Sequence, residues 1–550
     1  MKELIFGLIG GTALLMYGVD MMGEGLEKAS GEMMKKILSV LTGNVWSAFL
    51  VGTFLTALVQ SSTAITVLTV GFVNAGLMKL PQAAGVIYGA NIGTTITAQL
   101  MAFSFNFKLT DIALPVLGIG FAINYFVKNK KVKYIGQALM GFGMMFLGLK
   151  ILNSGIPFMK ESQSLRYFFI HYASIPVVGI LLGAFVTAMV HSSAATVGLV
   201  MVLAQAGLIN LETAVFIMFG DNIGTCLTAQ LASLTGNINA RRTAWAHTLY
   251  NVFGVILTWT FFPVFIDIVK AVTLYFQPNS DISAQIANSH TMFNLFSAAI
   301  FLPLTKYYVK FLYKIIKPKD EGHVPKLYLD KLLLDTPVAA LKASRTELIR
   351  GAEIVKGMLS NVMDLIYTEN TKKTALIADD EMVINQIQKD MTMYIVDISK
   401  RELTESQSIM VPAMINSVNI VERIGDHVMD ILKLCENREG KKLQFTCEAT
   451  EELKEIEGIL IEMFDNAIIS LGEKNGESIA RVVELEDKID ELSKKFQENH
   501  IKRLDEGICN VDSGVIYIDM ISHFERIADY IYKLTMLTKD ELFGTRRIIK

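Results

Sequence analysis

The stretch Gln60-Ser61-Ser62-Thr63 interrupts an apolar segment, residues 44–78, and a related stretch, His191-Ser192-Ser193-Ala194, interrupts a second one, residues 175–208. Both belong to a longer repeat. Residues 52–100 recur at 183–231, shifted by 131 positions without a gap, and 23 of the 49 positions are identical. Two copies of one unit, each with uncharged polar groups inside apolar sequence, are typical of ion-coupled membrane transporters.

A second polar block follows the first in each copy. Asn91-Ile92-Gly93-Thr94-Thr95 corresponds to Asn222-Ile223-Gly224-Thr225-Cys226, and Gln99 and Gln230 come about two helical turns later. Asp221 precedes the second block at the position where the first copy has Ala90. A carboxylate in an apolar run is costly, so we interpret Asp221 as functional, the alternative being a position near the water interface.

Apolar runs lie almost entirely before residue 315, and the remainder is rich in Glu, Asp and Lys. The 550 residues are therefore predicted to form a membrane domain, 1–318, and a soluble helical domain, 319–550. Within the first, repeat 1 covers about 1–130 and repeat 2 about 131–315. The net charge of −3 argues against a nucleic-acid partner, and the four cysteines have no spacing typical of a disulfide scaffold or zinc site.

Seven segments have the length and apolarity of a membrane crossing. They are 4–22, 82–103, 111–127, 134–152, 212–235, 243–262 and 290–312. Segment 4–22 is predicted to be a retained helix, not a cleaved signal, because its glycine spacing recurs in repeat 2. Segments 44–78 and 175–208 are too long for one crossing and are predicted to be re-entrant helical hairpins. Two short crossings, or one long tilted helix whose serines bond to its own backbone, are the alternatives.

Basic residues predict the orientation, because loops rich in Lys and Arg stay on the cytoplasmic side. If both hairpins return to the side they enter from, fifteen basic residues fall on one side and six on the other. The larger group is Lys28, Lys35, Lys36, Lys79, Lys128, Lys130, Lys131, Lys133, Arg241, Arg242, Lys306, Lys310, Lys314, Lys317 and Lys319. With this number of crossings, the two repeats are inverted relative to each other in the membrane, and the C-terminal domain is cytoplasmic.

Polar groups at membrane depth should face protein, water or a substrate. Helix N-termini at a break suit an anion such as phosphate, and the free carbonyls that end the preceding half-helices suit Na⁺. The predicted substrate- and ion-binding residues are Gln60, Ser61, Ser62, Thr63, Asn91, Thr94, Thr95, Gln99, His191, Ser192, Ser193, Asp221, Asn222, Thr225 and Gln230. Thr66, Thr69 and Thr187 are interpreted as packing residues. His191 has three open roles: a ligand, a proton carrier or an equivalent of Gln60.

The tips of the two predicted hairpins are the stretches 60–63 and 191–194. Together with the stretches 89–95 and 220–225, they resemble the type II sodium/phosphate cotransporter family, also called the phosphate:sodium symporter family. The resemblance covers most of residues 1–315. It implies an all-α, polytopic fold of inverted repeats whose hairpin tips hold phosphate and Na⁺. The first tip matches the family's Gln-Ser-Ser-Ser motif except for Thr63; the second departs at His191 and Ala194.

Residues 326–538 are predicted to form consecutive amphipathic helices. One apolar stripe, formed by Leu485, Ile489, Leu492, Phe496 and Leu504, predicts a bundle core. Glu422-Arg423-x-x-Asp426 recurs as Glu525-Arg526-x-x-Asp529, and each pair of carboxylates shares a helix face. The two pairs could converge on a divalent or iron-type metal, or form a salt-bridged surface with the arginines. The doubled pattern resembles the PhoU family of phosphate-signalling proteins, which implies two three-helix bundles and these four carboxylates as metal ligands.

The leading functional hypothesis is a sodium-coupled symporter of inorganic phosphate in the cytoplasmic membrane, working by alternating access with a cytoplasmic regulatory domain. A phosphate-sensing receptor and a carrier or exporter of a different anion are the alternatives. The chain has no G-x-x-x-x-G-K-[ST] loop, which disfavours a primary pump, and no recognisable nucleophile and base, which disfavours an enzyme. Expected partners are phosphate, Na⁺ and membrane lipid; the pattern permits a homodimer and does not require one.

Overall fold

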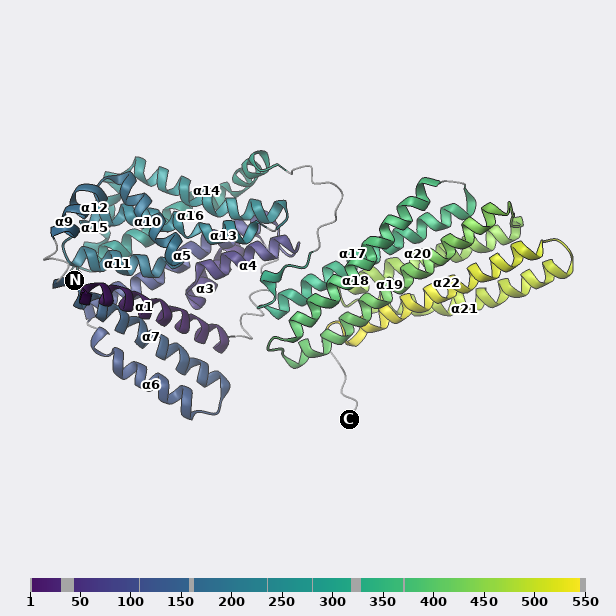
Figure 1. Ribbon diagram of the computed structural model, residues 1–550, viewed down its shortest axis with the longest axis horizontal. Helices are drawn as coiled ribbons and strands as arrows, with labels where there is room; N and C mark the ends of the chain where they lie inside the picture. Colours follow the sequence, from purple (N-terminus) through teal and green to yellow (C-terminus); the bar gives the residue numbers. More distant parts are fainter. Residues whose placement is uncertain are drawn as a thin grey trace. The chain divides into compact units, whose positions relative to one another are not determined.

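The computed structural model describes residues 2–30, 44–107, 109–157, 163–234, 236–278, 280–317, 328–368 and 371–544. The described residues form helices joined by short connections and contain no strand, so the all-helical prediction is confirmed. The chain divides into two compact units, residues 1–321 and 322–550 (Figure 1). The predicted boundary between residues 318 and 319 lies outside the described residues.

The first unit holds the helices of both repeats. In chain order they are α1 (Lys2–Ala29), α3 (Val45–Val59), α4 (Ser62–Asn74), α5 (Leu80–Phe107), α6 (Ala113–Phe126), α7 (Lys130–Ser154), α9 (Gln163–Phe168), α10 (Pro176–Val190), α11 (Ser193–Gln205), α12 (Leu211–Gly224), α13 (Cys226–Ser233), α14 (Ile238–Thr260), α15 (Phe262–Phe276) and α16 (Ile282–Ile315). A π-helical turn, Phe169–Ala173, continues α9. The sequence did not predict α9 or this turn.

Among the described residues, four helical stretches are long and apolar enough to cross a membrane: Phe6–Ala29, Lys130–Ser154, Leu211–Ser233 and Ile282–Ile315. Helix α5 also has sufficient length, but the polar block from Asn91 to Gln99 lowers its hydropathy. The predicted crossing 111–127 is shorter than expected. Asp111 ends a 3-10 turn, and the remaining 14 residues of α6 extend only about 21 Å, less than the ~30 Å hydrocarbon core.

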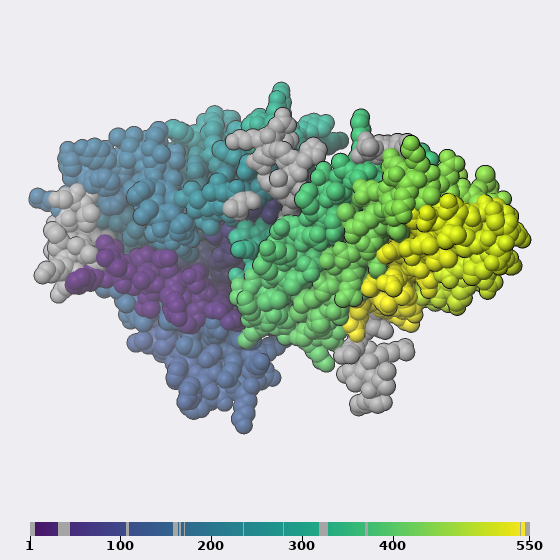
Figure 2. Space-filling model, turned by 45° about the vertical axis from the view of Figure 1, so that its right-hand side comes forward, coloured from purple at the N-terminus to yellow at the C-terminus, as the bar shows by residue number. Residues whose placement is uncertain are grey.

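The apolar surface of the first unit supports its assignment to the membrane. Helix α6 exposes Leu114, Phe121 and Tyr125, each more than half accessible, although the segment is apolar throughout. Together α6 and α7 form the darker blue lobe at the bottom of this unit in Figure 2. In water such a surface would be costly, whereas lipid tails accept it.

The predicted crossing 243–262 ends in a sharp bend. Helices α14 and α15 meet at 88° around Phe261, and Pro263 occupies the first turn of α15. Proline disfavours helical geometry at the preceding residue and removes a backbone donor, so the chain cannot continue α14 straight through it. The predicted crossing 243–262 therefore corresponds to α14, and α15 is an additional apolar helix that the sequence interpretation did not include.

Glycines let the helices of the first unit approach backbone to backbone. A Cβ added at Gly18 on α1 would lie 2.7 Å from the carbonyl oxygen of Gly141 on α7, and one added at Gly11 would lie 3.1 Å from that of Gly148. As the residue number rises on α1 it falls on α7, so these first helices of the two repeats pack antiparallel (Figure 1). Small residues at such contacts are the usual device for close helix packing in membranes.

The same device joins the broken helix of each repeat to the helix that follows it. Gly89 and Gly93 on α5 face α3, and their repeat equivalents, Gly220 and Gly224 on α12, face α10. A Cβ on Gly220 would lie 1.9 Å from the carbonyl oxygen of Ile180, closer than any real contact. The shared spacing of these glycines in the two repeats therefore fixes how each polar block sits beside its break.

The described part of the second unit contains six long helices: α17 (Pro337–Tyr367), α18 (Thr371–Ser399), α19 (Glu405–Gly440), α20 (Cys447–Gly472), α21 (Gly476–Asp505) and α22 (Val511–Asp540). The first three pack together, as do the last three, and the two groups meet along α19 and α22 and along α17 and α20. Leu485, Ile489, Leu492 and Phe496 are buried in its core, as the stripe on α21 predicts. The predicted helical bundle is confirmed.

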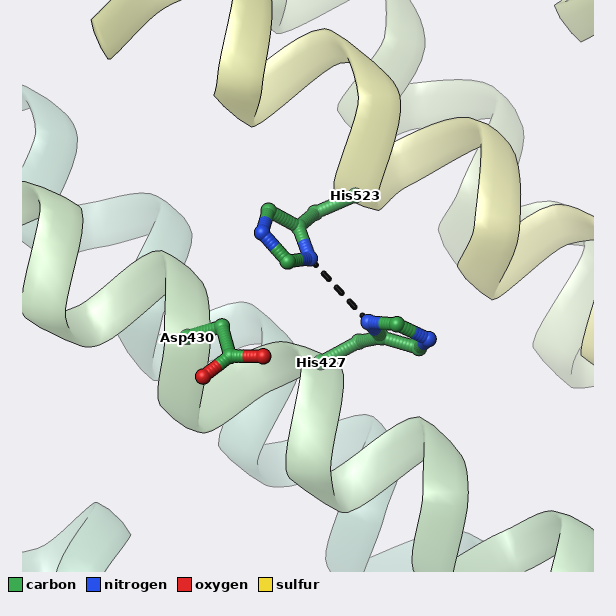
Figure 3. A group of neighbouring side chains, drawn as sticks. All are labelled: His427, Asp430 and His523. Atoms are coloured by element: carbon green, nitrogen blue, oxygen red, sulfur yellow. Dashed lines mark hydrogen bonds between the residues drawn. The ribbon is translucent and has the colours of Figure 1, made fainter.

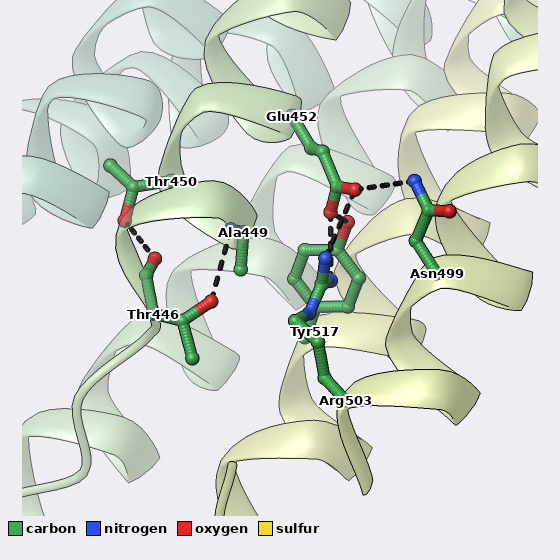
Figure 4. Close-up of polar contacts among 7 residues, drawn as sticks. All are labelled: Thr446, Ala449, Thr450, Glu452, Asn499, Arg503 and Tyr517. Atoms are coloured by element: carbon green, nitrogen blue, oxygen red, sulfur yellow. Dashed lines mark hydrogen bonds and ion pairs between the residues drawn. The ribbon is translucent and has the colours of Figure 1, made fainter. Parts of the chain in front are cut away.

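A nearly buried ion pair ties the second group of three helices together (Figure 4). Arg503 on α21 donates to Glu452 on α20 at 2.8 Å, and both side chains are about 10% exposed. Tyr517 on α22 and Asn499 also donate to Glu452. Burial raises the pKa of Glu452, but the hydrogen bonds from Arg503, Tyr517 and Asn499 outweigh it, so the net pKa lies below the ordinary value.

Replacing Glu452 with glutamine is expected to destabilise α20–α22 by about 3 kcal/mol at neutral pH, because Arg503 would remain buried without its counter-ion. The lowered pKa adds a pH dependence: the stabilisation is present above the unfolded value near 4.5 and is lost as the pH falls through the folded value. Hydrogen exchange of α20–α22 between pH 7 and pH 3 measures both effects.

Glu462→Gln is the matched control, since Glu462 pairs with Arg481 across the same two helices while both side chains are 40–45% exposed. This exposed pair should contribute less than about 1 kcal/mol. Equal effects of the two substitutions would show that burial of the Glu452 pair does not matter.

Candidate functional site

Each repeat contains a helix broken by a residue in the left-handed region. Gln60 separates α3 from α4 with φ 58° and ψ 20°, and His191 separates α10 from α11 with φ 56° and ψ 21°. The next residue caps the following helix in both cases: Ser61 accepts from the amide of Ala64, and Ser192 from that of Ala195. Non-glycine residues rarely adopt this conformation, and such strain concentrates at functional sites.

Each break residue is held by a threonine of its own repeat. Thr97 on α5 donates to the side-chain oxygen of Gln60, and His191 Nδ1 lies 3.2 Å from the hydroxyl of Thr228 on α13. Thr97 and Thr228 are repeat equivalents. His191 therefore replaces Gln60 in the same hydrogen-bonding position, which favours the third of its open roles.

The helices that follow the breaks pack against the opposite repeat. Helix α4 of repeat 1 contacts α13 and α14, and α11 of repeat 2 contacts α5 and α1. The pair α4–α13 and the pair α11–α5 are reciprocal, since α13 is the repeat equivalent of the second half of α5. Reciprocal contacts are what a two-fold relation between copies produces. They also place the threonine that holds each break on a helix that contacts the other repeat.

Asp221 is fully buried on α12. Thr187 on α10 lies 2.7 Å from its Oδ1 and 2.8 Å from the hydroxyl of Thr196 on α11, so one threonine bridges the carboxylate to both halves of the broken helix. The other oxygen, Oδ2, has no hydrogen-bond partner among the described residues. The alternative that Asp221 lies near the water interface is thus disfavoured. Thr187, which the sequence analysis interpreted as a packing residue, belongs to the polar site.

Asn91 and Asn222 have different surroundings despite their equivalent positions. Asn91 donates to Asn251 on α14 at 3.1 Å, and His247 Nε2 lies 3.3 Å from its oxygen. Asn222 donates to the carbonyl of Met218 in its own helix. The side chain of Asn91 therefore joins a polar network that crosses between repeats, whereas the side chain of Asn222 bonds within its own helix.

The remaining predicted residues divide into two groups. Gln99 donates to Asn288 and Thr291 on α16, and Gln230 donates to Thr248 on α14, so both amides connect helices. The hydroxyls of Thr94, Thr95 and Thr225 bond to carbonyls of their own helices. Ser62 is buried at the start of α4, and Thr63 and Ser193 are half-buried.

Several buried polar residues near these helices were not predicted from the sequence. His247 and Asn251 on α14, and His290 and Asn294 on α16, are almost completely buried. His247 Nδ1, His290 Nδ1 and Asn294 Oδ1 lack a protein partner within the described ranges. An unpaired buried polar group is costly, so water, an ion or a substrate should reach them. A histidine within an apolar helix was the signal that could have found two of them.

The four carboxylates predicted as metal ligands lie in two places. Glu422 and Asp426 on α19 lie beside Glu381 on α18; burial, and then Asp426, raises the pKa of both glutamates. Glu525 on α22 lies beside Asp490 on α21, and burial, followed by Asp490, raises its pKa as well. Each motif thus gathers acids of its own three-helix group. Asp529 pairs with Lys533 at 3.3 Å, not with the arginine of its motif.

The broken, interlocked repeats and the apolar helices define a multi-pass membrane protein of the secondary-transporter class, with a helical-bundle unit attached. Comparison with known proteins gives the family. Residues 14–154 and 159–275 match the Na⁺/Pi-cotransporter family, and residues 348–435 and 453–538 match the PhoU domain. The chain belongs to the Na⁺/Pi-cotransporter family and carries PhoU domains.

The relatives match different shares of the chain. "Uncharacterized protein YqeW" of Bacillus subtilis is 30% identical over 57% of this chain and 99% of its own length. "Putative inorganic phosphate export protein YjbB" of Salmonella typhimurium is 24% identical over 94% of both chains. The rat "Sodium-dependent phosphate transport protein 2A" is 30% identical over 17% of this chain and 15% of its own.

Among solved structures, the phosphate transport system regulatory protein PhoU from Streptococcus pneumoniae covers 37% of this chain and 94% of its own, with 18% identity and a TM-score of 0.33.

Proposed function

We propose that this protein is a sodium-coupled transporter of inorganic phosphate that works by alternating access, with the two broken helices as its binding site. The main supporting observation is the helix break that occurs in both repeats, at Gln60 and at His191. Each break is followed by a serine cap and a new helix N-terminus. Helix N-termini offer free amide donors and partial positive charge, which suit a phosphate anion. The family and the phosphate-transport names of its relatives support this substrate.

Asp221 is the proposed anchor for Na⁺. Its unpartnered oxygen, the hydroxyl of Thr187 and the carbonyls that end α10 are hard oxygen ligands of the kind that small cations prefer. Because the carboxylate is fully buried, a bound cation would offset a charge that the protein around it leaves unpaired. The same region would then hold a cation on Asp221 and an anion on the helix N-termini, which couples the two.

Inversion of the repeats underlies the proposed alternating access. The antiparallel packing of α1 on α7 and the reciprocal contacts of α4 and α11 support it, as both follow from a two-fold axis between the repeats. With the basic residues of the sequence on the inner side, the second unit is cytoplasmic. Of those residues, Lys35, Lys36 and Lys319 lie outside the described part of the chain.

Sodium-driven phosphate uptake into proteoliposomes tests the proposal. We expect labelled phosphate to accumulate only with an inward sodium gradient. Ser62→Ala and Ser193→Ala should each lower the rate roughly 10-fold or more, since a hydrogen bond to a charged ligand contributes about 1.5–3 kcal/mol.

Ser154→Ala is the control, because Ser154 is exposed and bonds only to its own helix. Phosphate uptake that does not depend on the sodium gradient would rule out sodium coupling. Unchanged uptake rates in both serine variants would show that the hairpin tips are not part of the binding site.

Export of phosphate is the second candidate, and the name of the relatives that match along almost the full chain favours it. The two candidates differ in the direction of net flux under cellular gradients. Cells loaded with labelled phosphate and then expressing the protein should lose label faster than control cells if export is its role, and should retain it if uptake is.

Regulation by the second unit is the remaining part of the proposal. A PhoU-type unit next to a phosphate transporter could restrain transport when internal phosphate is high. Deleting the residues after 325 should then leave transport active at internal phosphate concentrations that inhibit the full chain. Identical inhibition of the two proteins would contradict this role.

A further inference from the structure

Two histidines face each other where the two groups of helices in the second unit meet. His427 lies on α19 and His523 on α22, and their Nδ1 atoms are 3.0 Å apart. Asp430, one turn after His427, presents its carboxylate to the same place, and one ligand atom from each of the three residues lies within 4.8 Å of the others. Figure 3 shows both rings and the carboxylate turned toward a common point.

The two imidazole rings meet Nδ1 to Nδ1 at hydrogen-bond distance. Neutral rings expose a lone pair, so two Nδ1 atoms in contact avoid repulsion only if one ring donates a hydrogen bond or a cation lies between them.

We propose that His427, Asp430 and His523 bind a divalent transition metal of the zinc type. Imidazole nitrogen and carboxylate oxygen are ordinary ligands of Zn²⁺, at about 2.0–2.2 Å, and three protein ligands leave a fourth tetrahedral position open. Ligands at that distance in a tetrahedral site lie about 3.3 Å from one another, close to the separation of the two nitrogens. The site differs from the Glu-Arg-x-x-Asp carboxylates, none of which is among its three ligands.

Two neighbours bear on how the metal would bind. Tyr530 stacks on the ring of His427, with centroids 5.6 Å apart, and so fixes its orientation. Lys433 donates to Asp430 at 2.8 Å, and the metal would have to displace it. Lys433 is 69% exposed and Asp430 is 41% exposed, so this ion pair costs little to break.

A metal at this position would join α19 to α22 and thereby link the two three-helix groups of the unit. Its binding free energy would add to the stability of their contact, because a site assembled from two helices exists only when they are together. The proposal does not depend on transport, and its test requires no transport measurement.

The test uses the full-length chain, purified without a histidine tag and treated with a chelator. Equilibrium dialysis against Zn²⁺, with bound zinc measured by mass spectrometry, should give one equivalent of zinc per chain. The His427→Ala and His523→Ala variants should each bind zinc at least about 100-fold more weakly. Co²⁺ in place of Zn²⁺ should give the visible absorption of a tetrahedral site. Zinc should also raise the unfolding temperature of the unchanged chain.

Three controls separate the possible results. His171→Ala changes an exposed histidine in the first unit and should bind zinc normally. A variant that combines Glu422→Gln with Glu525→Gln tests the carboxylate motifs, and it should still bind one equivalent of zinc per chain. Asp430→Asn, a mild change at a half-exposed position, serves if a histidine variant does not fold, and it should weaken binding too. No bound zinc, full binding by both histidine variants, or loss of binding in the glutamate variant alone would overturn the proposal.

Discussion

Replacing Asp221 with asparagine is expected to weaken sodium activation of phosphate transport by on the order of 100-fold to 1,000-fold. The two side chains have nearly the same size, so the change removes charge and little else. A unit charge about 4 Å from a cation contributes about 4 kcal/mol at an effective dielectric constant near 20. The fully buried carboxylate, with one oxygen lacking a protein partner, is where that contribution should appear.

The measurement is the sodium dependence of phosphate uptake in proteoliposomes. Glu212→Gln provides the matched control: it neutralises an acid on the same helix whose side chain is 39% exposed and pairs with Lys270. It should leave the sodium dependence within about twofold, as expected for a screened surface pair. If the Asp221→Asn variant kept the sodium activation of the unchanged chain, the carboxylate would be only a hydrogen-bond acceptor for Thr187.

Alanine in place of Gly220 is expected to destabilise the first unit by about 3 kcal/mol or more and to abolish most transport. The added methyl group would lie 1.9 Å from the carbonyl oxygen of Ile180 and 2.7 Å from the amide nitrogen of Ala184, both on the backbone of α10. Backbone atoms cannot rotate away as a flexible side chain can, so α10 and α12 must separate. Such overpacking costs about 1–3 kcal/mol in ordinary cores and more where backbones collide.

Thermal unfolding of the purified protein in detergent should show a midpoint lower by at least about 5 °C. Gly118→Ala is the control, since a Cβ at that position on α6 meets no atom within 4 Å. It should be neutral or slightly stabilising, because alanine favours helix more than glycine does. Similar midpoints for the two variants would mean that the α10–α12 contact adjusts freely.

The broken helices were predictable because their signal is local and doubled. A polar triplet inside an apolar segment too long for one crossing predicts an interruption, and its recurrence 131 residues later argues against chance. The partners across helices were not predictable in the same way. Asn91 meets Asn251, 160 residues further along the chain, and only the packing of α5 on α14 brings them together. The bend at Phe261 depends on one proline, which the apolar pattern hides.

The second unit shows the same division. Periodicity predicted consecutive helices and the core stripe of α21, and the repeated Glu-Arg-x-x-Asp pattern resembled the PhoU family, which implies two three-helix bundles. The histidine pair has no such signal, since the two rings are 96 residues apart and occupy unrelated positions relative to the two motifs. A sequence repeat reveals residues that copies share, whereas this pair exists because two different helix positions face each other.

The antiparallel contact of α1 with α7 has a consequence for biosynthesis. Gly11 and Gly18 pack against Gly148 and Gly141, which the ribosome adds only after α3, α4, α5 and α6. During translation, the N-terminal helix therefore enters the bilayer with its glycine face uncovered. It completes its packing only when the matching helix of the second copy arrives, so a chain that stops before residue 130 cannot bury that surface as the finished protein does.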